Sequence, residues 1–146
     1  RDRGRIGTIT LPVNCLIPKP ATPFQWAKQI RPSEYAAKLR WLRRSLAKVP
    51  NVVIEAMSPR SAEIQALTSR GDRRVGDLLE LWAETGSWRQ AVRTWEERGG
   101  SVDHFAFRAL KPNDPLPWGH LRTGASSAAL GNQWNKAVGG NVDAAA

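Results

Sequence analysis

Three short segments carry most of the side chains that could bind a ligand or transfer a proton: residues 18–26, 69–74 and 114–120. The second segment has three arginines, whose planar guanidinium groups recognise carboxylates and phosphates through paired hydrogen bonds. The third contains His120, a side chain suited to acid–base catalysis near neutral pH. Nothing nearby orients His120, so we interpret residues 114–120 as a loop anchored by its prolines and Trp118, with catalysis as the less favoured alternative.

The arginine-rich segment combines capping residues with surplus positive charge. Gly71 predicts a left-handed helix stop, and Asp72 predicts the N-cap of a following helix. Capping does not explain Arg70, Arg73 and Arg74. They either pair with acids of a neighbouring domain, hold an anionic substrate group or serve a structural role, and the sequence leaves these alternatives open.

The proline-rich segment, residues 18–26, follows an apolar stretch that is typical of a strand. Ligands of α/β proteins bind beyond the carboxyl ends of strands, so this segment is the expected rim of a site. The alternative, which we prefer for Phe24 and Trp26, is that both rings pack on the hydrophobic core.

The sequence offers few metal ligands. Cys15 is the only cysteine, and His104 and His120 are the only histidines. An iron–sulfur cluster or a structural zinc needs several such ligands, so we predict no metal site within this chain. Cys15 has apolar neighbours and is interpreted as a small buried residue; a reducing compartment fits a single cysteine.

The formal net charge of +9 permits attraction to nucleic acid, but the basic residues are spread along the chain. A merely basic surface and a functional polyanion site remain alternatives. No apolar run approaches the length of a membrane span, and no signal-peptide pattern is present. The sequence opens at Arg1 in a basic run, and we expect it to be a piece of a larger protein.

We expect strands and a helix in the first part of the chain and mainly helices after it, and these elements must position the three segments. Residues 5–17 predict a strand buried on both faces, with Pro12 at a bulge or edge. Residues 51–57 predict a second strand, and residues 103–108 a possible third.

Helical spacing of apolar residues predicts the helices. One begins at Ser33 and buries a face formed by Tyr35, Leu39, Leu42 and Leu46. Another is capped by Ser58 or Ser61 and stops near Gly71. The remaining helices span residues 72–85, with Val75, Leu78, Leu79 and Trp82 inward and Gly86 as the stop; residues 87–98, with Trp88, Ala91, Val92 and Trp95 inward; and, weakly, residues 125–138.

Taken in this order, the segments resemble the C-terminal part of a family of radical S-adenosylmethionine (SAM) proteins, many of which carry an N-terminal cobalamin-binding domain. The resemblance rests on Pro-Lys-Pro-x-Thr-Pro-Phe-Gln-Trp at residues 18–26, Arg-Gly-Asp-Arg-Arg at 70–74 and Leu-Pro-Trp at 116–118. It spans roughly residues 5–124, with Gly119 standing where the family commonly has an acid.

The resemblance implies an α/β fold leaning to mostly α: the terminal strands of a partial (β/α)6 barrel followed by a helical C-terminal extension. Residues 1–30 would supply the last barrel strand and rim loop, residues 31–124 the helical extension with one or two short strands, and residues 125–146 a flexible tail. The parent would be a cytoplasmic enzyme that uses SAM and a [4Fe-4S] cluster, with cobalamin as a further possibility.

For individual residues, the resemblance implies that Asn14, Lys19 and Thr22 lie nearest the SAM or substrate cavity. The substrate or interdomain set is Arg70, Asp72, Arg73, Arg74, Trp26 and Trp118. The cluster cysteines are absent from this chain, so the segment is expected to be inactive without the upstream barrel domain of the same polypeptide.

Two other functions stay open. The first is a basic module that binds RNA or a ribonucleoprotein surface without catalysis, supported by the net charge but by no RNA-binding motif. The second is a regulatory or scaffolding domain with no chemistry.

Overall fold

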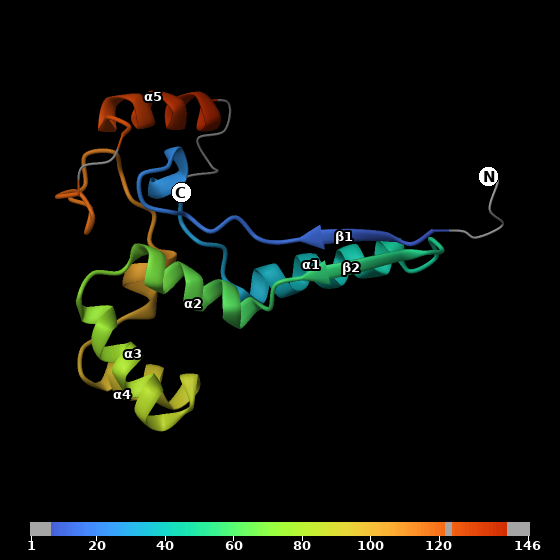
Figure 1. Ribbon diagram of the computed structural model, residues 1–146, viewed down its shortest axis with the longest axis horizontal. Coiled ribbons are helices and arrows are strands. Elements are labelled where there is room, and N and C mark those ends of the chain that lie inside the picture. Colours follow the sequence, from blue (N-terminus) through green and yellow to red (C-terminus); the bar gives the residue numbers. More distant parts are fainter. Residues whose placement is uncertain (1–6, 122–123, 140–146) are drawn as a thin grey trace.

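The computed structural model describes residues 7–121 and 124–139, and within them the chain is mainly helical (Figure 1). A βαβ unit comes first, a group of helices follows, and a last helix returns to the proline-rich segment. In chain order the elements are β1 (Ile9–Val13), η1 (Pro23–Trp26, a 3₁₀ turn), α1 (Pro32–Leu46), β2 (Val52–Ala56), α2 (Pro59–Arg70), α3 (Arg74–Thr85), α4 (Trp88–Glu97), η2 (Asp103–Phe107, a π-helical turn) and α5 (Ser127–Val138).

Strands β1 and β2 pair in parallel, with Ile9 opposite Val52 and Val13 opposite Ala56. Helix α1 connects them and packs on the pair through Tyr35 and Leu39, both buried. The Tyr35 hydroxyl also donates to the Val13 carbonyl oxygen at 3.2 Å. The predicted second strand is therefore confirmed, and so are Tyr35 and Leu39 of the predicted inward face of α1, whereas Leu42 and Leu46 are only half-buried. The helix begins one residue before Ser33.

The predicted partial (β/α)6 barrel is wrong for the described residues, which form a single two-stranded sheet and are otherwise mostly helical. The first strand is also shorter and far less buried than predicted. The side chains of Ile9 and Val53 are 60% and 46% exposed, because each strand has one neighbour and one covering helix. The apolar sequence of the first strand predicts burial on both faces of the sheet, whereas this chain covers only one of them.

The possible third strand at residues 103–108 is also wrong, since η2 is helical. Its consecutive residues Phe105 and Ala106 are both buried. Adjacent side chains of a strand point to opposite faces, whereas a helical turn brings both toward one core.

Helices α3 and α4 form a hairpin over the main hydrophobic core. Gly86 ends α3 in the left-handed conformation, with φ of 63°, and the Ser87 side chain caps α4 by accepting from the Gln90 amide. Both features were predicted. The prediction that Leu79 faces inward is wrong: its side chain is 39% exposed, and Leu81 is buried instead.

A second, smaller core forms where α5 covers η1 (Figure 1). The Trp26 and Trp134 ring centroids lie 6.3 Å apart, and the edge of Phe24 meets Trp134 at 6.0 Å. Trp26 is 2% exposed, so its predicted role in the core is confirmed. The weak helix predicted at residues 125–138 is present as α5, and the chain end after residue 139 lies outside the described residues.

Gly71 stops α2 for a different reason from the predicted one. Its φ is −73°, which is not left-handed. A Cβ atom at this position would lie 2.2 Å from Val75 Cγ2 and 2.7 Å from the Leu67 carbonyl oxygen. Glycine is needed here because the α2–α3 corner leaves no room for a side chain.

We predict that Gly71→Ala lowers the free energy of unfolding by about 1–3 kcal/mol, because the added methyl group overpacks the corner. Urea denaturation of the 146-residue chain measures the change. Gly76→Ala is the matched control: this residue lies in α3 with nothing within 4 Å of an added Cβ, so alanine should leave stability equal or raise it by up to about 1 kcal/mol. Equal losses in both variants would contradict the corner argument.

Candidate ligand-binding site at the junction of three motifs

The three segments singled out in the sequence meet at one hollow of about 500 Å³. Pro20 comes from the proline-rich segment, Arg73 from the arginine-rich segment, and Trp118 and His120 from the third. Long stretches of chain, residues 27–68 and 75–113, separate these segments, so only the fold brings them together. The full lining is Pro20, Thr68, Ser69, Gly71, Asp72, Arg73, Pro117, Trp118, His120 and Leu121.

Two side-chain hydrogen bonds connect the proline-rich segment to the other two. Lys19 Nζ donates to Ser69 Oγ at 2.9 Å, and Trp118 Nε1 donates to Gln25 Oε1 at 2.8 Å. The same Gln25 oxygen accepts from the Ala21 amide at 3.1 Å. Ala21 has φ of 56°, a conformation uncommon for a residue with a side chain, and the Gln25 contact helps to hold it.

Gln25 is the residue that the sequence interpretation missed. It is 3% exposed and accepts two hydrogen bonds from the segments that form the hollow. A signal was present: a polar residue lies between Phe24 and Trp26, where an apolar side chain would be expected if the turn only covered the core.

Arg70 is buried, at 3% exposure, and serves the fold. It donates from Nη1 to the Ala106 carbonyl oxygen at 2.8 Å and from Nη2 to the Arg108 carbonyl oxygen. Burial, and then repulsion by Arg108, lower its pKa to about 10, so it stays charged at neutral pH. Of the alternatives for the arginines, the structural one applies to Arg70.

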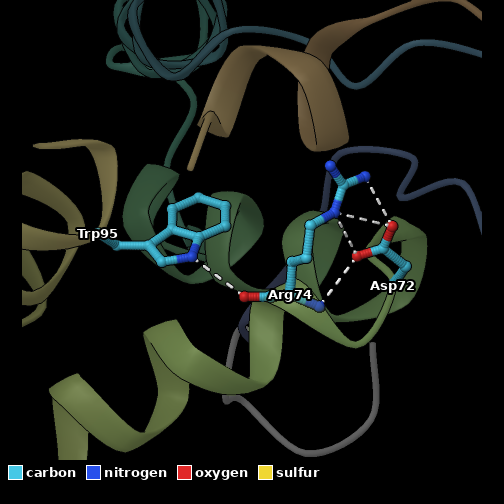
Figure 2. Close-up of polar contacts among 3 residues, drawn as sticks. All are labelled: Asp72, Arg74 and Trp95. Carbon is cyan, nitrogen blue, oxygen red and sulfur yellow. Dashed lines mark hydrogen bonds and ion pairs between the residues drawn. The ribbon is translucent and has the colours of Figure 1, made fainter. Parts of the chain in front are cut away.

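Asp72 and Arg74 form a fork at the start of α3 (Figure 2). Asp72 Oδ2 accepts from Arg74 Nη2 at 2.7 Å, and Oδ1 accepts from the Arg74 backbone amide at 2.9 Å. Hydrogen bonding from the Arg74 side chain lowers the pKa of Asp72. Arg73 occupies the N-cap position predicted for Asp72, yet the carboxylate still satisfies an amide of the first turn.

Arg73 is exposed, and its guanidinium group forms no hydrogen bond within residues 7–121 and 124–139. It faces the hollow together with the Trp118 ring and His120. A cation, an aromatic wall and an imidazole suit the binding of an anionic or planar group. Ser69 also lines the hollow, and its hydroxyl accepts the hydrogen bond from Lys19 described above.

The residues predicted nearest to SAM do not share one site. Asn14 Oδ1 accepts from the Met57 amide at 3.1 Å, and Asn14 lines a separate groove of about 630 Å³ between the end of β1 and α1. Lys19 and Thr22 lie in the proline-rich segment, where Thr22 Oγ1 donates to the Lys19 carbonyl oxygen at 2.8 Å.

No group of three or more His, Cys, Asp or Glu residues is close enough to hold a metal ion in the described part of the chain. The thiol of Cys15 accepts from Gln29 Nε2 at 3.3 Å. A search of residues 7–121 and 124–139 also finds no helix with the length and apolar character of a membrane span.

Comparison with known proteins finds no protein-family model, no curated protein and no solved structure that matches this chain.

We predict that Gln25→Ala loosens residues 115–121, because the Trp118 indole N–H and the Ala21 amide lose a buried acceptor. The expected loss of stability is about 1–3 kcal/mol. Hydrogen exchange measured by mass spectrometry should show reduced protection at residues 18–26 and 115–121. Gln90→Ala, on the exposed side of α4, is the control and should leave exchange unchanged. Unaltered protection in Gln25→Ala would show that Gln25 does not hold the junction.

Proposed function

We propose that this chain is the C-terminal part of a radical SAM iron–sulfur enzyme, in which it forms a ligand-binding wall and does not hold the cluster. The parent would cleave SAM or carry out methyl-transfer or rearrangement chemistry on a substrate still to be identified. One observation supports this proposal: the three motifs that carry the resemblance, far apart in sequence, line a single hollow.

The described residues do not fit an iron–sulfur cluster. Cys15 is the only thiol, and its sulfur already accepts a hydrogen bond from the Gln29 side-chain amide. A [4Fe-4S] cluster needs several cysteine ligands, which the proposal assigns to the upstream domain of the same polypeptide. Asn14, Lys19 and Thr22 remain our proposed contacts with SAM or substrate, and each would exchange a present hydrogen bond for one to the ligand.

Exposed apolar side chains support an upstream partner within the parent. Ile9, Leu16 and Val53 are 60%, 58% and 46% exposed. Val53 lies on the sheet face away from α1, where a partner would bury it, and Ile9 and Leu16 lie at and beyond the two ends of β1. The proposal also places the parent in the cytoplasm, where the reducing conditions suit a cluster enzyme.

The test uses the complete open reading frame that encodes this chain, expressed and purified without oxygen. We expect a longer polypeptide with about four irons per chain, and 5′-deoxyadenosine or methyl transfer after a reductant and SAM are added. Cobalamin content is read from the absorption spectrum of the same sample. A complete product that lacks iron and leaves SAM intact would overturn the proposal.

In the active parent enzyme, we predict that Arg73→Ala reduces turnover of the natural substrate by about tenfold or more, because a guanidinium group facing the hollow is lost. Iron content should not change. Arg89→Ala, an exposed arginine on α4, is the control and should retain full turnover. Equal turnover in the two variants would show that the hollow does not contribute to catalysis by the parent enzyme.

RNA binding is a second candidate, and a feature of α1 favours it. Trp41 is 64% exposed, and Lys38 and Arg44, three residues before and after it, are its neighbours on the helix surface. An exposed ring between cations matches the way proteins stack and neutralise single-stranded RNA. This face is remote from the three-motif hollow in sequence and shares none of its lining residues.

If this candidate function holds, Trp41→Ala weakens binding of a single-stranded RNA oligomer by about 1–3 kcal/mol, the usual contribution of one stacked base. Fluorescence anisotropy at two salt concentrations separates stacking from charge attraction. Leu79→Ala removes an exposed apolar side chain from α3 and should not affect binding. An unchanged affinity in Trp41→Ala excludes stacking on α1.

A further inference from the structure

A second hollow, of about 250 Å³, lies on the other side of the arginine-rich segment. Four basic side chains line it: Arg70, Arg74, His104 and Arg108. They come from the end of α2, the start of α3 and the η2 segment. Leu116 and neighbouring prolines of the third motif form the facing wall. Of the four basic residues, His104 and Arg108 lie outside the substrate or interdomain set identified from the sequence.

Several hydrogen-bond donors at this hollow are unused. Arg74 binds Asp72 with Nε and Nη2, and its Nη1 extends away from that carboxylate (Figure 2). The Arg108 guanidinium group forms no hydrogen bond or ion pair with any residue in the ranges 7–121 and 124–139. Arg70 differs, because its two Nη groups already bond carbonyl oxygens.

The lining of this hollow has an excess of positive charge. It contains three guanidinium groups and one carboxylate, that of Asp72, which leaves two positive charges with His104 neutral. Burial, and then the charges of Arg108 and Arg74, lower the pKa of His104, while Asp72 opposes this effect. Burial and Arg108 likewise lower the pKa of Arg70. Repulsion by Arg108 therefore contributes to the lowered pKa of both groups, after burial.

We propose that this hollow binds an oxyanion, the phosphoryl group of a small molecule, between the guanidinium groups of Arg108 and Arg74 and above the buried charge of Arg70. A tetrahedral phosphoryl group offers acceptors in several directions, which suits donors that arrive from different elements. Asp72 does not exclude the anion, because its oxygens are occupied by Arg74. Phosphate binding at this hollow requires neither iron nor SAM, so its test is independent of the test of the function proposed above.

The experiment follows both histidines of the 146-residue chain by NMR while inorganic phosphate is added. A bound anion stabilises the imidazolium form, so the pKa of His104 should rise with phosphate in a saturable way. His120 lines the other hollow and is the internal reference, so its ring signals should respond less to phosphate than those of His104. Acetate at matched ionic strength separates phosphoryl recognition from carboxylate recognition, and equal binding of acetate would overturn the phosphoryl assignment.

Two variants distinguish specific phosphate binding at this hollow from general electrostatic attraction to a basic protein. Arg108→Ala should weaken phosphate binding by about tenfold or more, because a charged donor is lost from the site. Its side chain is exposed and only its backbone carbonyl oxygen accepts from Arg70, so the variant keeps the contact that supports the fold. Arg89→Ala removes the same charge from α4 and should bind phosphate normally. Equal weakening in both variants, or no saturable change at His104, would reject the site.

Discussion

The fold depends on the placement of one buried cation, Arg70, against main-chain carbonyl oxygens. A charge removed from water must find partners, and here both lie in the segment around η2, at Ala106 and Arg108. The same segment accepts at the Ala106 carbonyl oxygen from the Gln29 amide at 3.2 Å. It donates from the Leu110 amide to the Trp26 carbonyl oxygen at 2.9 Å. This short segment therefore joins the end of α2, the proline-rich segment and both cores.

The three arginines of the arginine-rich motif have different roles in the structure. Arg70 is structural, Arg74 is shared between Asp72 and the smaller hollow, and Arg73 faces the larger hollow with no hydrogen-bond partner in the described residues. A ring contact adds to this division, since the Arg74 guanidinium carbon lies 4.9 Å from the Phe105 ring centroid. Consecutive arginines thus project to opposite sides of one corner, and the corner separates two hollows of different character.

Local signals predicted the helices well. Serine caps at Ser58 and Ser87 and the glycine stop at Gly86 act within a few residues, so the sequence contains all that they need. Long-range features were not predictable in the same way. The apolar residues of β1 do not reveal how many strands will lie beside them, and the run 103–108 has the β-rich composition of a strand although it packs as a turn. Gln25 acts through Trp118, 93 residues away, and Arg108 through the hollow that it lines, and local periodicity encodes neither of these relations.

The larger hollow lies between residues that belong to two hydrophobic clusters. Trp118 packs against the core of η1 and α5, whereas the corner that carries Asp72 and Arg73 continues into α3 and the main core. A molecule held there would contact residues attached to both cores, so its binding free energy would stabilise only the folded state in which the two lie together. Occupancy would therefore raise the free energy of opening either core locally, and the two cores would unfold more nearly as one cooperative unit.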